Sequence, residues 1–198
     1  MGKVGAVVGI GGMGTTVFDV FTHKFAKEVA ATGTSVRTIA LNRPQDSLNQ
    51  AQAQEKIALT CPDIEGDSEV DDDRWQEVLS LHAGEIRDAL NGTSAIVVLA
   101  GMGGFTGSSA APFVAEIGKE LGVKVSAVVT MPIPFEGEKR AQKAAAAHAE
   151  LSKFADQVVT VSGTELLDKA DLGASLDQAY GKIDEELAAK VAELIEAA

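Results

Sequence analysis

The sequence predicts a three-layer α/β fold, in which a mostly parallel six-stranded sheet carries helices on both faces. Short apolar runs and helical patterns alternate along the chain, and this alternation is typical of parallel strands joined by crossover helices. The first run is short, rich in β-branched residues and ended by glycine, as expected of a buried strand. The expected strands cover residues 4–10, 36–41, 57–59, 95–100, 125–130 and 157–161.

Apolar residues at a spacing of three or four mark the helices between these strands. The first helix has an apolar face made of Val17, Phe21, Phe25 and Val29. Further helices are expected over residues 72–90, 110–121 and 140–154. A long final helix is expected over residues 175–198, with an apolar stripe of Leu176, Tyr180, Ile183, Leu187, Val191 and Leu194. No linker or repeat interrupts the pattern, so residues 1–198 are expected to form a single domain.

The amino-acid composition limits the kinds of molecule that the protein is expected to bind. The formal net charge is −12 and the isoelectric point is near 4.6, so the surface is expected to repel nucleic acid and anionic membranes. The apolar N-terminal run is short and interrupted by glycine, so direct membrane insertion is not expected. The one cysteine, Cys61, cannot form an internal disulfide and suits a reducing compartment. These features predict a cytoplasmic protein.

Two glycine-rich turns each follow a strand and lead into a helix. One covers residues 9–16 and the other residues 101–109. Glycine lets the backbone approach a phosphate closely, and the free amides of a helix N-terminus face it. Ligands of open α/β sheets bind at the carboxyl ends of the strands. Two such turns on neighbouring strands therefore predict an amide cradle for a di- or triphosphate. The sequence has no P-loop pattern.

The second turn carries a family resemblance. AGMGGFTGSSAAP at 100–112 resembles the phosphate-binding signature of the tubulin/FtsZ family, and VVTMPIPFEGEKR at 128–140 is similar to the FtsZ loop that holds the ribose. Weaker similarity covers the whole chain, including VSGTELL at 161–167 and the final helix, which resembles the family's central helix. The resemblance implies a Rossmann-like strand order of 3-2-1-4-5-6, a guanine-nucleotide site and a role in cell division or membrane remodelling.

The resemblance also implies which residues would bind the phosphates. The α- and β-phosphates would be lined by Gly11, Gly12 and Thr16. The β- and γ-phosphates would be held by Gly103, Gly104, Thr106 and Gly107. Asn42 stands where the family has an asparagine after the second strand. Phe105 replaces a glycine of the signature, and its ring is expected either to pack away from the site or to narrow it.

The remaining implied residues would bind the nucleoside. Glu136 and Arg140 match the positions that contact the ribose in FtsZ. Tyr180 and Asp184 match those that stack on guanine and pair with its edge, and their spacing of four puts them on one helix face. A carboxylate can accept from both guanine N1–H and the 2-amino group, which adenine does not offer in that arrangement. GTP or GDP is therefore the expected ligand.

Departures from the family argue against catalysis. The chain stops near the end of the central helix, so the family's water-positioning loop and second domain are not in the sequence. We therefore expect little or no GTP hydrolysis and assign no catalytic residue. The stretch 63–73, which matches the γ-phosphate loop of FtsZ, has seven carboxylates in eleven residues. It should repel a triphosphate unless a divalent ion such as magnesium intervenes, so GDP is expected to bind as well as GTP.

The partners implied by the resemblance are guanine nucleotide and another FtsZ-like subunit, including a second copy of this chain. No residue is assigned as a metal ligand. A first alternative is an NADP-binding protein, since Arg43 follows the second strand and could meet a 2′-phosphate. That reading leaves the second glycine turn without a role. A second alternative is a non-enzymatic protein that has lost nucleotide binding and acts on a partner through its final helix.

Overall fold

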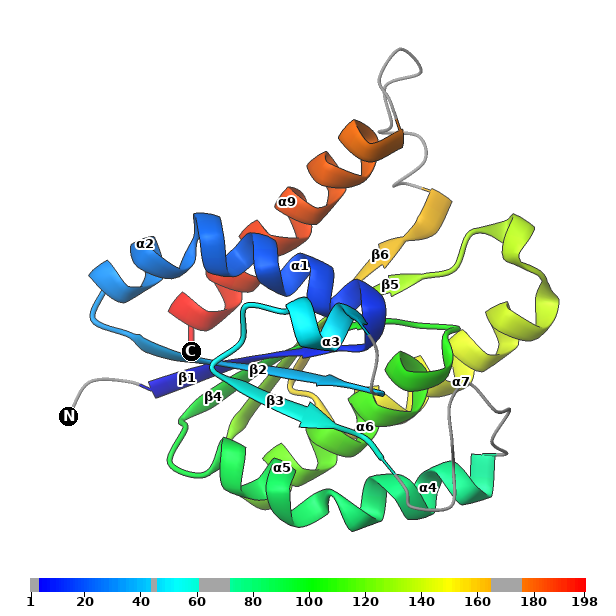
Figure 1. The fold of residues 1–198 in the computed structure, drawn as a ribbon, viewed down its shortest axis with the longest axis horizontal. Coiled ribbons are helices and arrows are strands. Elements are labelled where there is room, and N and C mark those ends of the chain that lie inside the picture. The colour runs from blue at the N-terminus through cyan, green and yellow to red at the C-terminus, as the bar shows by residue number, and fades with distance from the viewer. Residues whose placement is uncertain (1–3, 44–45, 61–71, 165–175) are drawn as a thin grey trace.

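A computed structural model describes residues 4–43, 46–60, 72–164 and 176–198 of the protein. Its centre is a six-stranded parallel sheet with the order β3-β2-β1-β4-β5-β6 (Figure 1). The strands are β1 (Val4–Ile10), β2 (Ser35–Asn42), β3 (Glu55–Ala58), β4 (Ala95–Gly101), β5 (Lys124–Met131) and β6 (Gln157–Ser162). The predicted sheet, its parallel pairing and its strand order are confirmed.

Helices cover both faces of this sheet, as predicted (Figure 1). One face carries α1 (Gly11–Lys24), α2 (Ala26–Ala31), α3 (Asp46–Gln50) and α9 (Leu176–Glu196). The other carries α4 (Asp72–Leu81), α5 (Ala83–Leu90), α6 (Phe105–Glu120) and α7 (Glu138–Phe154). A short 3-10 helix, η1 (Pro134–Glu136), precedes α7. None of the helices in the described ranges has the length and apolar content that crossing a membrane requires.

The central strands are continuously apolar because both of their faces are covered. Side chains of β1 alternate between two core clusters: Val7 packs with α1 and α9, whereas Ala6 and Val8 pack with the helices of the opposite face. Gly9 pairs in register with Ala40 and Leu99, and a Cβ built on it would lie 2.7 Å from the carbonyl oxygen of Gly14. The chain therefore turns tightly from β1 into α1.

Two of the predicted helices are each interrupted. The pattern over residues 72–90 predicts one helix, but α4 ends at Leu81 and α5 starts after His82, which has φ −93° and ψ 0°. Nε2 of His82 lies 2.9 Å from the carbonyl oxygen of Thr60, so the break coincides with a tertiary contact that the pattern does not encode. The first helix is likewise divided at Phe25 into α1 and α2.

Two helix starts also differ from their predictions. α6 begins at Phe105 rather than at residue 110, because the second glycine-rich turn itself supplies the first turn of the helix. α7 begins at Glu138 rather than at residue 140. Starting α6 earlier brings its N-terminus next to the end of β4, and this placement sets up the site below.

Candidate functional site

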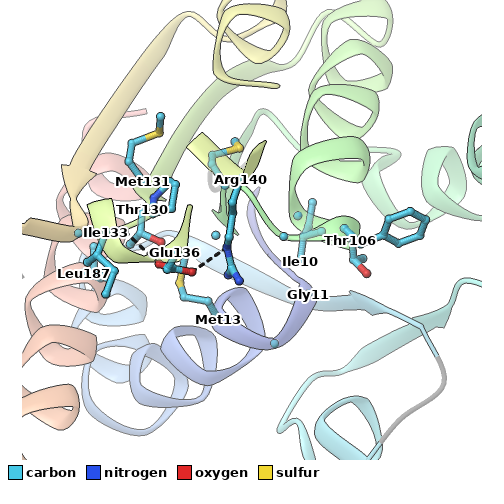
Figure 2. Close-up of a pocket in the computed structure, with 18 of the residues that line it drawn as sticks. Ile10, Gly11, Met13, Thr106, Thr130, Met131, Ile133, Glu136, Arg140 and Leu187 are labelled. Atoms are coloured by element: carbon cyan, nitrogen blue, oxygen red, sulfur yellow. Dashed lines mark hydrogen bonds and ion pairs between the residues drawn. The ribbon is translucent and has the colours of Figure 1, made fainter. Parts of the chain in front are cut away.

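A pocket of about 590 Å³ lies at the carboxyl ends of β1, β2, β4 and β5. Figure 2 shows Leu187 of α9 at one end of it and Thr106 of α6 toward the other, with Glu136 and Arg140 between them. We refer to these ends as the α9 end and the α6 end. Residues near both ends of the chain line the pocket. Ile10, Gly11 and Met13 come from the N-terminal part, and Leu187 comes from the C-terminal helix.

The first glycine-rich turn connects β1 directly to α1. Gly11 starts the helix with a φ of +70°, in the left-handed region that glycine tolerates best. A Cβ on Gly14 would lie 2.4 Å from the carbonyl oxygen of Leu99, so this glycine lets α1 pass closely over β4. The hydroxyl of Thr16 donates to the carbonyl oxygen of Gly12 at 3.0 Å, and Thr16 does not line the pocket.

The second glycine-rich turn is held in shape by its own polar groups. The N–H of Gly103 donates to Oγ of Ser108 at 2.8 Å, and φ of Gly103 is +88°. A Cβ on Gly103 would lie 2.7 Å from Cγ of Arg140. A Cβ on Gly107 would lie 2.3 Å from the carbonyl oxygen of Gly101. Both positions therefore require glycine, because side chains from neighbouring residues or the backbone fill the space.

The two turns meet. A Cβ built on Gly11 would lie 3.5 Å from the backbone nitrogen of Gly107 and 3.7 Å from Cβ of Thr106. The starts of α1 and α6 therefore converge, and the first N–H groups of a helix have no acceptor within it. Neither α1 nor α6 has an acidic residue in its first turn, although α2, α5 and α7 each have a glutamate there. This arrangement suits an anion.

Phe105 both packs and lines the pocket. Its ring centroid lies 4.8 Å from that of Trp75 on α4, with an interplanar angle of 48°. Trp75 is 2% exposed, so this contact ties the start of α6 to the core beneath it. Phe105 also belongs to the pocket wall at the α6 end. The ring packs on Trp75 while the residue also lines the pocket, so neither of the two alternatives describes Phe105 alone.

Glu136 and Arg140 form an ion pair in the middle of the pocket. Oε2 of Glu136 lies 2.7 Å from Nε of Arg140, four residues later on α7. Oε1 of Glu136 accepts a hydrogen bond from the N–H of Ile133 at 3.0 Å, which orients the carboxylate from a second direction. The side chains are partly exposed, so a hydroxyl-bearing ligand in the pocket can reach both.

Asp184 is the acidic group at the α9 end. It lines the pocket between Ile183 and Leu187, which are both buried. Burial raises the pKa of Asp184 to about 6, because a charged carboxylate loses hydration there. The described residues at the α9 end are therefore apolar apart from this carboxylate, a combination that fits a flat heterocycle with N–H donors on its edge.

The family profile described as Tubulin/FtsZ family, GTPase domain, matches residues 6–171. The chain belongs to the tubulin/FtsZ family. It is 33% identical over 165 residues to cell division protein FtsZ 1 of Pyrococcus furiosus, a match that covers 83% of this chain and 42% of that protein. It is 45% identical over 113 residues to cell division protein FtsZ of Buchnera aphidicola subsp. Schizaphis graminum, covering 56% of this chain and 29% of the relative.

Solved structures of the tubulin/FtsZ family share the fold. The FtsZ dimer of M. jannaschii superposes with a TM-score of 0.82 at 28% identity, covering 99% of this chain and 55% of that one. CetZ2 from Haloferax volcanii, a GTPγS-bound protofilament, gives a TM-score of 0.81 at 23% identity, covering 98% and 58%. The chain thus spans less than two thirds of each of these relatives.

The structure brings most of the site residues predicted from the tubulin/FtsZ resemblance to one pocket. Its lining includes Gly11, Gly12, Asn42, Gly104, Phe105, Thr106, Gly107, Glu136, Arg140 and Asp184. Thr16 and Gly103 lie outside the lining, because the Thr16 hydroxyl bonds within α1 and Gly103 shapes the turn. Tyr180 belongs to α9, but its side chain is outside the described residues, as is the acidic stretch 63–73.

Several pocket residues were not among the individually predicted site residues, although some of them stand in the two predicted glycine-rich turns and Arg43 was considered only as a ligand of a 2′-phosphate. They are apolar or glycine residues for the most part: Ile10, Met13, Gly101, Met102, Met131, Pro132, Ile133, Gly163, Ile183 and Leu187, together with Thr130 and Arg43. Most stand at the carboxyl ends of strands, so their position relative to the sheet was the available signal. Arg43 directly follows Asn42, whose buried side-chain oxygen accepts the Arg43 N–H at 2.9 Å.

A magnesium ion, which the family resemblance suggests as a companion of the phosphates, finds no protein ligand set in the described part of the chain. Within the described ranges no three His, Cys, Asp or Glu side chains gather to hold a metal. The pocket-lining carboxylates there are Glu136 and Asp184, and neither lies at the α6 end. The described residues therefore do not fit a protein-held ion at the converging helix N-termini.

Proposed function

We propose that this chain binds a guanine nucleotide, GTP or GDP, in the pocket, and that the chain alone hydrolyses GTP little or not at all. The observation that carries the proposal is the convergence of the α1 and α6 N-termini at one end of a pocket whose other end holds Asp184. The volume of about 590 Å³ lies within the range of about 300–1,000 Å³ typical of small-molecule sites.

The proposed orientation follows from charge. Phosphates lie at the α6 end, where the backbone of residues 11–12 and 104–107 and the hydroxyl of Thr106 can donate to them. The ribose lies beside Glu136 and Arg140. Guanine lies at the α9 end, where Asp184 accepts from N1–H and the 2-amino group. Tyr180, four residues before Asp184, is proposed to stack on the base.

Little or no hydrolysis is expected from where the acids lie. Among the described pocket residues the carboxylates are Glu136, which is paired with Arg140, and Asp184 at the opposite end from the phosphates. Neither can accept a proton from water attacking the terminal phosphate. Among the described residues, then, none is placed to act as a general base, a group worth roughly 10²- to 10⁴-fold in rate. We therefore propose that this chain acts as a nucleotide-dependent binding unit.

The cellular setting belongs to the same proposal. The relatives include cell division proteins, a structure titled FtsZ dimer and a GTPγS-bound CetZ2 protofilament. We propose that the chain forms one domain, acts in the cytoplasm in cell division, and associates with itself or with another FtsZ-like subunit when nucleotide is bound. A parallel sheet that continues through the described chain supports the single domain.

The test is a titration of the purified protein with fluorescent GDP, GTP, ATP and NADPH, followed by assays of phosphate release and of polymer by sedimentation. We expect saturable binding of both guanine nucleotides, at least about tenfold weaker binding of ATP and NADPH, and phosphate release no faster than in buffer. Asp184→Ala should weaken guanine binding more than ATP binding. Equal affinity for ATP, or rapid turnover, would contradict the proposal. Absence of any binding would favour a partner protein that has lost the nucleotide.

A further inference from the structure

Two cations lie over the aromatic ring of Phe105, which lines the α6 end of the pocket. The centroid of the Phe105 ring lies 5.9 Å from the guanidinium carbon of Arg43 and 4.8 Å from Nζ of Lys143. Arg43 follows the last residue of β2 and lines the pocket, whereas Lys143 comes from α7, and both side chains are partly buried. The negative face of an aromatic ring attracts cations. The Phe105 ring, in the first turn of α6, is therefore one of the contacts of each cation.

This arrangement adds charge of one sign to a helix end that is already positive. The N-terminus of α6 carries partial positive charge, and cations are ordinarily favourable at the C-terminus of a helix instead. The pocket-lining carboxylates of the described chain, Glu136 and Asp184, lie on the side of η1 and α9. The α6 end thus combines a helix N-terminus with the guanidinium of Arg43, which lines the pocket, while Lys143 contacts the Phe105 ring from outside the lining. Both features favour a negatively charged ligand group.

Arg43 lines the pocket near Phe105, at the end where the proposed orientation places the last phosphate of a nucleotide. With the base at the α9 end and the ribose at Glu136, the phosphates run toward Thr106, in the direction that Figure 2 shows from Leu187 to Thr106. Each further phosphate extends away from α9. The third therefore reaches the part of the wall made by Phe105 and Arg43. A guanidinium is permanently charged and can give two parallel hydrogen bonds to one phosphate.

We propose that Arg43 binds the terminal phosphate of GTP, that Phe105 positions its guanidinium, and that this contact makes the chain prefer GTP over GDP. The inference rests on the proposed guanine-nucleotide site. It differs from the expectation drawn from the acidic stretch 63–73, by which GDP should bind as well as GTP. Because the charge is supplied by a side chain, the preference persists when divalent cations are removed.

The experiment compares dissociation constants for GDP and GTP in EDTA at fixed ionic strength. For the wild type we expect GTP to bind at least about tenfold tighter than GDP. Arg43→Gln should remove most of this difference by weakening GTP binding about tenfold, while GDP binding changes less than about threefold. Phe105→Leu, which keeps an apolar side chain but removes the aromatic face, should give an intermediate ratio.

Arg87→Gln is the matched control. Arg87 lies on α5, which precedes β4 at the opposite end of the sheet, and its side chain is partly exposed and pairs with Glu120. The Arg87→Gln variant removes the same charge as Arg43→Gln, and it should leave the ratio of the dissociation constants for GTP and GDP unchanged. A wild type without GTP preference, or an Arg43→Gln variant that weakens GDP and GTP equally, would overturn the inference while leaving the nucleotide site intact. A wild type that binds neither nucleotide would overturn the proposed function as well.

Discussion

The carboxyl group of Asp184 lies partly buried on α9, with Ile183 and Leu187 beside it in the pocket wall. Burial raises its pKa to about 6 from an ordinary value of 3.8. The empty protein thus holds a carboxylate that is costly to keep charged, and a ligand that donates hydrogen bonds to it offsets this cost. Asp184 should therefore influence both the pH dependence of guanine binding and the stability of the nucleotide-free protein, and both effects can be measured.

Guanine binding should weaken as the pH falls through about 6, because protonated Asp184 loses acceptor capacity on the edge that faces the base. At pH 5 about one tenth of the empty protein carries the ionised group, so affinity for GDP should be about tenfold lower than at pH 7.5. Titrations across this range measure the effect. Phosphate monoesters also titrate near pH 6, so the same series on Asp184→Asn supplies the baseline. If GDP affinity depends on pH in the same way in the wild type and in Asp184→Asn, the assignment of Asp184 as the guanine-binding carboxylate is contradicted.

The same carboxyl group should destabilise the empty fold at neutral pH. Its pKa in the folded protein is raised, so its contribution to stability is full below about 3.8 and is lost as the pH rises through about 6. Asp184→Asn should therefore stabilise the empty protein at pH 7 by about 1 kcal/mol, a modest value because the group is partly exposed and screened. Thermal unfolding without nucleotide measures it. A lower Tm for the variant would count against the role of burial.

At the scale of elements, glycine decides how closely helices approach the sheet. α1 passes over β4 at Gly14, where a Cβ would lie 2.4 Å from the backbone carbonyl oxygen of Leu99. α6 passes the end of β4 at Gly107, where a Cβ would lie 2.3 Å from the carbonyl oxygen of Gly101. Because both contacts are with backbone, no side chain can move aside. The convergence of the two helix N-termini therefore depends on these small residues.

Gly14→Ala should destabilise the protein by about 1–3 kcal/mol, since α1 must shift away from β4. Gly84→Ala is the control within a helix: a Cβ there meets nothing within 4 Å, so it should be neutral or stabilising by up to about 1 kcal/mol. Urea unfolding of both variants tests the difference. Equal free energies of unfolding for Gly14→Ala and Gly84→Ala would mean that the close approach of α1 to β4 does not affect stability.

At the scale of the whole molecule, the pocket joins segments from both ends of the chain. Its wall includes the end of β1 with the start of α1, the start of α6, and α9 near the C-terminus. α9 packs across α1 and the central strands, and an ion pair between Lys24 and Glu185 links the two helices. A ligand that contacts the α6 and α9 ends at once therefore connects parts of the fold that are far apart in sequence.

Nucleotide binding should slow amide hydrogen exchange both at the start of α6 and around residues 183–187 of α9, because the ligand binds the folded arrangement in which both regions line the pocket. Hydrogen exchange with mass spectrometry, with and without saturating GDP, measures both regions. The C-terminal part of α7, which is remote from the pocket lining, serves as the internal reference. Protection confined to α6 would contradict the proposed placement of the base on α9.

The sequence by itself determined the sheet, its strand order through the family resemblance, and ten of the 22 residues that line the pocket. Buried parallel strands need continuous apolar runs, and close turns need glycine, so both leave a local pattern. What only the tertiary structure decided depends on distant segments. The approach of Gly11 to Gly107, the packing of Phe105 on Trp75, the break at His82 and the placement of Arg43 all arise where two remote stretches touch. Local periodicity carries no information about such contacts, because it reports only which face of an element is buried.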